Sequence, residues 1–280
     1  MIPQITKDII ASQPIVIPIF HVVALKLQHM VNEKTYNIDD VIKLVNEDTA
    51  LASEMIKYAN SPYYAGTSPI TTIKNAIVRL GSKQIVNLAF SASLANIRSD
   101  NPFINSHMKD LWYHSLSVAK ASACLAVEIN KVNKLNELDS DEAYLAGLLH
   151  DIGKLYLLKA IDGLSKSGVI QPNNNTILHI LADLNYHQGV RVLKHFRLPD
   201  IFSDVLERLG YTNWKTGSLD HLIAVISLSD IITTCICDDI KLFDSNEILN
   251  NIDDKVDFIN IGNLSEIYNI INSSYLSQSR

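Results

Sequence analysis

Apolar residues recur along this chain at the spacing of an α-helix rather than in the alternation typical of a β-strand. A clear case is the segment 73–80, in which Ile73, Ala76, Ile77 and Leu80 fall at positions i, i+3, i+4 and i+7. Only 10 glycines and 8 prolines interrupt the 280 residues. The pattern therefore predicts an all-α fold.

Helix signals also mark where the first elements begin and end. An apolar face over 41–45 predicts a helix from Asp39. A second helix is expected to begin near Asp48 and to end before Pro62, because proline cannot continue it. Gly81 supplies a left-handed stop after the segment described above. The helices on either side of this glycine are predicted to form a tight αα-hairpin.

A polar break at 98–102 divides the pattern in two. It predicts an N-terminal helical subdomain over 1–103 and a C-terminal helical subdomain over 104–280, with a long helix directly after the break. A capping-box-like start at Asp139 predicts a further helix that runs through Lys154. The remaining expected elements are helices over 177–196, 201–209 and 222–235 and an acidic surface segment over 238–254.

The charge of the chain limits what these helices are expected to bind. The net charge is −6 with a pI near 5.8, and no cluster of Lys and Arg stands out. Such a field repels a phosphate backbone. The αα-hairpin resembles a DNA-reading helix-turn-helix, but only Lys74, Arg79 and Lys83 lie nearby, so packing explains it better. We therefore expect no nucleic-acid partner.

Cysteine content and hydropathy indicate the compartment. Cys124, Cys235 and Cys237 fit neither a disulfide framework nor a thiolate zinc site, which indicates a reducing environment. The first 20 residues lack the basic start and apolar run of a secretory signal. The longest apolar stretches, such as 222–229, fall short of the roughly 20 residues that cross a bilayer. The expectation is a cytoplasmic protein with no membrane partner.

Four titratable residues stand out together as a candidate metal site: His114, His150, Asp151 and Asp230. Each is expected in a helix, and His150 and Asp151, adjacent on one helix, would project about 100° apart and hold one ion at its edge. Nitrogen and oxygen ligands together suit manganese, iron, zinc or nickel better than calcium. The alternative for His150 and Asp151 is an ordinary buried pair that stabilises helix packing.

The segments around these residues resemble the H, HD and D motifs of the HD phosphohydrolase superfamily. They are WYHSLSVA at 112–119, AGLLHDIGKL at 146–155 and LSDII at 228–232. Three further segments are similar to the HDOD branch of that superfamily: PIVIPIFHVVALKL at 14–27, YANSPYYAGTSPITTIKNAIVRLGSKQI at 58–85 and RLPDIF at 197–202. The resemblance covers roughly residues 14–235. It implies an HD-domain-like helical bundle with an additional N-terminal helical subdomain.

The chain departs from the related HD-GYP diguanylate phosphodiesterases, which carry further metal-binding histidines and a Gly-Tyr-Pro signature. Alignment puts Asn185 where the first of these histidines would fall and Leu209 and Gly210 where a His pair would sit, while His187 is two positions displaced. No Gly-Tyr-Pro occurs. The resemblance therefore implies one divalent metal at most, whether manganese, iron, zinc, nickel or magnesium.

The resemblance implies a signal-transduction or regulatory module, because HDOD proteins are generally regarded as output or interaction domains. Such a module would keep a residual metal-site pocket and bind a protein partner or a small ligand, with weak or no enzyme activity. The alternative is a metal-dependent phosphohydrolase acting on a nucleotide or another phosphate ester. In that case Asp151 and Lys154 are the catalytic residues, with Lys154 holding the anionic substrate. Nucleotide sensing without turnover is a third possibility.

Overall fold

The computed structural model describes residues 15, 19–34, 36–61, 64, 68–133, 137–210 and 218–237, and every regular element among them is an α-helix. The predicted all-α fold is therefore confirmed. The described residues group into an N-terminal unit, 16–98 with 196–199, and a C-terminal unit, 99–195 with 200 onward. The domain division predicted from the sequence, which reaches residue 280, extends beyond the described ranges and stays a prediction.

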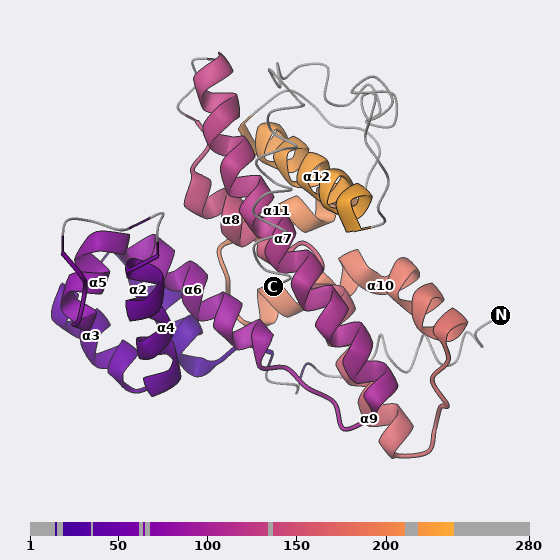
Figure 1. Cartoon of the computed structure of the whole chain (residues 1–280). Helices are drawn as coiled ribbons and strands as arrows, with labels where there is room; N and C mark the ends of the chain where they lie inside the picture. The colour runs from indigo at the N-terminus through magenta and orange to yellow at the C-terminus, as the bar shows by residue number, and fades with distance from the viewer. Residues whose placement is uncertain are drawn as a thin grey trace. The chain divides into compact units, whose positions relative to one another are not determined.

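The N-terminal unit is a small helical bundle (Figure 1). Its helices are α2 (Val22–Glu33), α3 (Ile38–Asn46), α4 (Thr49–Ala59), α5 (Ile73–Leu80) and α6 (Ser82–Ala95). The carboxylate of Asp48 accepts hydrogen bonds from the first-turn amides of α4, so this helix begins where the sequence predicts. Gly81 has a φ of +81° between α5 and α6, which confirms the expected hairpin. Leu27, Met55 and Phe90 are fully buried in the core.

The C-terminal unit is built around one long helix, α7 (Figure 1). Its helices are α7 (Pro102–Asn133), α8 (Ser140–Leu149), α9 (Ile152–Lys166), α10 (Asn174–His195), α11 (Asp200–Leu209) and α12 (Ser218–Cys237). Helix α7 packs against α8, α9 and α12, while α10 packs against α9 and α11. The segment predicted over 238–254 lies outside the described residues. No helix in the described part of the chain is long and apolar enough to cross a bilayer.

The prediction of a single helix from Asp139 through Lys154 is wrong, because the helix is interrupted between His150 and Asp151. His150 ends α8 as its C-cap, and Asp151 is the N-cap of α9 with φ −111° and ψ 18°, outside the helical region. The break lets α8 pack on α7 while α9 packs on α10. His150 and Asp151 therefore lie in a turn between two helices and not along the edge of one.

Two glycines allow the close approach of helices on either side of this turn. A Cβ on Gly147 of α8 would lie 2.7 Å from Ser122 Oγ and 3.0 Å from Ala119 Cα, both on α7. A Cβ on Gly153 of α9 would lie only 1.9 Å from the backbone oxygen of Asn185 on α10. Because backbone atoms cannot give way as side chains can, Gly153 fixes how closely α9 and α10 pack.

Candidate metal site

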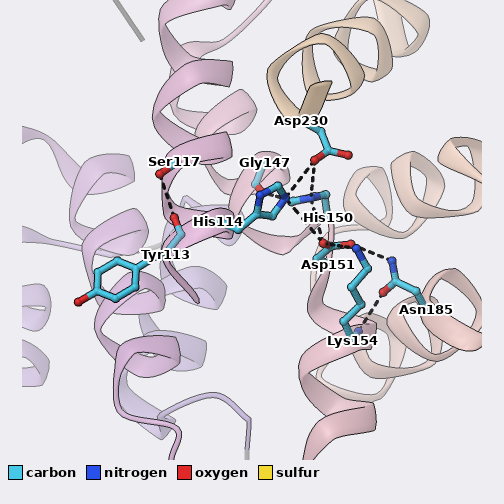
Figure 2. Close-up of polar contacts among 9 residues, drawn as sticks. All are labelled: Tyr113, His114, Ser117, Gly147, His150, Asp151, Lys154, Asn185 and Asp230. Atoms are coloured by element: carbon cyan, nitrogen blue, oxygen red, sulfur yellow. Dashed lines mark hydrogen bonds and ion pairs between the residues drawn. The ribbon is translucent and has the colours of Figure 1, made fainter. Parts of the chain in front are cut away.

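The four residues predicted from the sequence come together in the C-terminal unit from three directions (Figure 2). His114 is on α7, Asp230 is on α12, and His150 and Asp151 form the turn between α8 and α9. The Nε2 atoms of the two histidines and one carboxylate oxygen of each acid point toward a common region. The convergence expected from the motif spacing is thus present, although from a turn and two helices.

Four of the distances between these atoms are compatible with the coordination sphere of one ion. His114 Nε2 lies 3.0 Å from Asp230 Oδ1 and 3.9 Å from Asp151 Oδ2. His150 Nε2 lies 3.4 Å from Asp151 Oδ2 and 3.8 Å from Asp230 Oδ1. Ligand atoms bound to one ion at about 2.1 Å are about 3.0–3.4 Å apart at right angles or tetrahedrally, and about 4.2 Å apart when opposite. These four separations fall within that range, although Asp230 lies outside the group of three residues whose ligand atoms are all within 4.8 Å of one another.

His150 is held in the orientation of a metal ligand. Its ring is almost fully buried, and its Nδ1–H donates a hydrogen bond of 2.7 Å to the carbonyl oxygen of Gly147. This bond keeps a proton on Nδ1 and leaves Nε2 facing the other three residues, where its lone pair serves a metal once the Nε2 proton is lost. Nε2 is buried and has no hydrogen-bond partner. A buried polar atom without a partner is costly, so this atom indicates a missing ligand.

Asp151 directs its carboxylate away from the helix that it caps. An aspartate at an N-cap ordinarily accepts hydrogen bonds from the first-turn amides, but Asp151 makes no such side-chain bond. Its Oδ2 accepts a hydrogen bond of 2.6 Å from Lys154 Nζ, and its Oδ1 accepts one of 2.8 Å from Asn185 Nδ2. The carboxylate is therefore available to the histidines while almost completely buried.

Asn185 on α10 caps the N-terminus of α9 in place of Asp151. Its Oδ1 accepts a hydrogen bond of 2.9 Å from the backbone N–H of Lys154 in the first turn of α9, and its Nδ2 donates to Asp151. Sequence reasoning named Asn185 only as a departure from a metal-binding histidine and missed this positioning role. The available signal was a polar residue on the buried face of α10, which also contains Gly189 and Val192.

The charges in the site are strongly coupled. Burial favours the neutral imidazole of His150, but the carboxylates of Asp151 and Asp230 outweigh it and raise the pKa of His150 to about 9. Burial alone would raise the pKa of Asp151, yet the positive charges of His150 and Lys154 hold that pKa well below its usual range. Below about pH 9 His150 is therefore protonated in the metal-free protein, and its Nε2–H faces Asp151 at 3.4 Å and Asp230 at 3.8 Å without a well-formed hydrogen bond.

Lys154 and Asp230 both stay ionised, and part of the site is open to solvent. Although burial favours the neutral amine, Asp151 raises the pKa of Lys154 above its ordinary value. Burial would raise the pKa of Asp230, but a hydrogen bond from His114 and the charge of His150 lower it. The side chain of Asp230 is 43% exposed and that of His114 is 21% exposed. An ion can therefore reach the cluster from this side.

The donor set fits one divalent cation. Among the described residues, His114, His150 and Asp151 form a group whose ligand atoms all lie within 4.8 Å of one another, and Asp230 adds an oxygen close to both histidines. Two imidazoles and two carboxylates suit a transition metal. The positions compared with HD-GYP histidines contribute no further imidazole: His187 is exposed, and Leu209 ends α11.

The fold and this cluster together define an HD-like helical protein. The family model of the HDOD domain matches residues 17–208, more than half of the chain, and the chain therefore belongs to the HDOD domain family.

Solved structures of other proteins share this fold. One from Shewanella amazonensis SB2B, provisionally named a metal-dependent phosphohydrolase, is 24% identical with a TM-score of 0.65 and 91% of each chain covered. One from Marinobacter aquaeolei VT8, provisionally named a signal transduction protein, is 18% identical with a TM-score of 0.56, covering 98% of this chain and 61% of that one. At these identities the likeness shows the fold alone.

A curated relative is an uncharacterized protein of Treponema pallidum (strain Nichols). It is 23% identical over 189 residues, which is 63% of this chain and 34% of that protein. The chain thus spans about a third of the length of this relative.

Proposed function

We propose that this protein is a regulatory HDOD module in which His114, His150, Asp151 and Asp230 bind one divalent metal ion. The observation that carries the proposal is His150 Nε2, which is buried, has no hydrogen bond and faces three further donor groups. A buried histidine that served packing alone would be expected to satisfy both ring nitrogens. The module is proposed to act in the cytoplasm by binding a protein partner or a small ligand.

Binding is favoured over turnover because the described residues offer ligands for one metal ion and no second set of ligands beside it. Both oxygens of Asp151 already accept a hydrogen bond, Oδ1 from Asn185 and Oδ2 from Lys154, which leaves this carboxylate little capacity beyond one ion. Neither Asn185 nor the exposed His187 supplies a second set of ligands. Among the solved structures of this fold, one is provisionally named a signal transduction protein, which is consistent with this choice.

A second candidate function is hydrolysis of a nucleotide or another phosphate ester. Lys154 favours it, because its ammonium group lies beside the metal-facing carboxylate and its side chain is 34% exposed. A metal ion at the site would polarise the phosphate and lower the pKa of a bound water. In this candidate Lys154 holds the anionic substrate and Asp151 contributes to the attack. The name of the Shewanella amazonensis structure is consistent with it.

Metal content and turnover of matched variants test the proposal. We expect close to one Mn²⁺ per chain in the wild type after chelator treatment and reloading, and a loss of affinity of about 100-fold or more in Asp151→Ala. Asp162→Ala is the control, because Asp162 is an equally buried aspartate on the same helix, outside the cluster. Phosphate release from a panel of nucleotides and generic phosphate esters is measured with Mn²⁺ added, and we expect none.

The outcomes separate the candidates. Wild-type protein that binds no metal, or an Asp151→Ala variant that binds it as well as the wild type, would refute the metal site. Stoichiometric metal together with hydrolysis that Asp151→Ala abolishes would replace the regulatory function with the enzyme. Ligand-induced thermal stabilisation by a nucleotide, with no product formed, would identify the small ligand.

A further inference from the structure

One oxygen atom of the site, Asp151 Oδ2, is approached by two different kinds of group. On one side lie His114 Nε2 at 3.9 Å and His150 Nε2 at 3.4 Å, the atoms proposed to bind the metal. On the other side, Lys154 Nζ donates a hydrogen bond of 2.6 Å to the same oxygen. Figure 2 shows the lysine side chain rising along α9 to reach this carboxylate. The oxygen proposed to bind the metal therefore already accepts a hydrogen bond from a cation.

A metal on Oδ2 and the ammonium group of Lys154 in its present position would be close neighbours. With a metal–oxygen bond of about 2.2 Å added to the present contact, the two cations would lie at most about 4.8 Å apart. Repulsion between like charges at this distance is strong where the surroundings are largely buried, as they are at Asp151. Binding of the metal therefore works against the Lys154 contact.

The ammonium group of Lys154 cannot move to the other oxygen of Asp151, but it can move into solvent. Asn185 Nδ2 holds the other oxygen of Asp151 at 2.8 Å, and its partner Oδ1 accepts the backbone N–H of Lys154. The lysine side chain is 34% exposed, so the ammonium group can turn into solvent while the backbone stays anchored. The geometry thus allows two arrangements of Asp151: held by the lysine, or held by the metal.

We propose that Lys154 is a built-in competitor of the metal, which lowers the affinity of the site so that metal occupancy acts as a switch. This inference rests on the proposed metal site and adds its regulation. A site in which Asp151 had no lysine contact would bind its ion more tightly. Here each binding event has to break a charge-assisted hydrogen bond, so occupancy follows the concentration of available metal.

Isothermal titration of the full chain with Mn²⁺, repeated with Ni²⁺, tests this directly. We expect Lys154→Met to bind the metal about tenfold more tightly than the wild type, because methionine keeps the length of the side chain and removes the charge. Lys154→Arg keeps the charge and should bind as weakly as the wild type. Lys194→Met is the matched control: it removes the lysine of an exposed ion pair, with Glu207 at 2.8 Å, and should leave the affinity unchanged.

A second measurement guards against a variant that merely folds poorly. In the presence of chelator, Lys154→Met should melt at a lower temperature than the wild type, because Asp151 loses its counter-charge. Saturating Mn²⁺ should then raise its melting temperature by more than it raises that of the wild type. Metal affinity in Lys154→Met that equals or falls below the wild-type value overturns the inference and leaves the metal site standing. Absence of metal binding in both proteins refutes the proposed function itself.

Discussion

Helix α9 has a buried aspartate near each end, and the two are held in different ways. Both Asp151 and Asp162 are 3% exposed. Asp162 accepts a hydrogen bond of 2.6 Å from Ser99 Oγ and pairs with Lys166 at 3.2 Å, both of which are donors that match its oxygens. Asp151 also has a neutral and a cationic donor, but two imidazole nitrogens face it without forming a hydrogen bond.

This difference shows which feature of a buried acid indicates a site. Burial and a lysine partner are common to both aspartates, so neither property separates function from structure. The separating feature is the buried Nε2 of His150, which lacks a partner although several groups that could serve a metal surround it. The Asp162 end forms an ordinary structural ion pair, whereas the Asp151 end has the arrangement of groups from which we propose a metal site.

The two ends of α9 also differ in how tightly the helix is packed. Matched glycine substitutions at the two ends test this difference. A Cβ on Gly153 would meet the backbone of Asn185 at 1.9 Å, whereas a Cβ on Gly163 would meet nothing within 4 Å. We expect Gly153→Ala to lower the free energy of unfolding by about 4 kcal/mol. Gly163→Ala should raise it by about 0.5–1 kcal/mol, because alanine is the better helix former.

Chemical denaturation of the chelated proteins measures both changes. The Gly153→Ala variant should also lose metal binding, since the displacement of α10 would move Asn185 away from Asp151. Equal stabilities for the two alanine variants would show that α9 and α10 can separate at little cost. The positions of the site residues would then not depend on this contact.

The sequence allowed the helical class and the four clustered residues to be predicted, because both depend on local pattern and motif spacing. It did not allow the break at His150 and Asp151 to be predicted. The apolar pattern continues through this turn and no proline marks it, so Asp151 and Gly153 alone did not indicate a break. The turn depends instead on contacts between α9 and Asn185, 31 residues further along the chain from Lys154. The hydrogen bond between Ser99 and Asp162 joins residues 63 positions apart, and the sequence pattern did not predict it either.

Protonation of His150 should affect only the Asp151 end of α9, because only that end includes an imidazole. The charged groups that face His150 are Asp151 at the start of α9 and Asp230 of α12, and the ring of His114 of α7 lies beside it with ring centroids 5.3 Å apart. The carboxylates raise the pKa of His150 to about 9, so below that pH a metal must displace a proton. We expect the affinity for Mn²⁺ to fall about tenfold for each unit of pH, or about 100-fold from about pH 8 to about pH 6.

The metal-free protein should show the opposite trend. The folded pKa of about 9 lies above the unfolded value near 6.5, so the contribution of His150 to stability is complete below about pH 6.5 and is lost as the pH rises through about 9. Titrations of Mn²⁺ and denaturant melts in chelator, both across this range, give the two slopes. An affinity for Mn²⁺ that is flat between about pH 6 and about pH 8 would show that His150 is neutral before the metal binds. Asp162→Asn should leave both slopes unchanged.

The smallest effect that we expect distinguishes the neutral donors at the two ends of α9. Asn185 donates to Asp151 at 2.8 Å, and Ser99 donates to Asp162 at 2.6 Å. Replacing either with alanine leaves a buried carboxylate short of one donor, which should cost about 1–3 kcal/mol of stability. Asn185→Ala should also weaken Mn²⁺ binding about tenfold, because Asp151 would be free to turn and cap α9 instead of facing the histidines.

Ser99→Ala should leave the affinity for Mn²⁺ unchanged, since Asp162 has no part in the cluster. Denaturation midpoints and Mn²⁺ titrations of the two variants, taken together, test whether the amide positions a ligand or only fills a hydrogen bond. Equal losses of stability with unequal losses of affinity would assign the positioning role to Asn185. If the affinities fell equally, a loss of overall stability would explain both, and Asn185 would be no more than the counterpart of Ser99 at the other end of the helix.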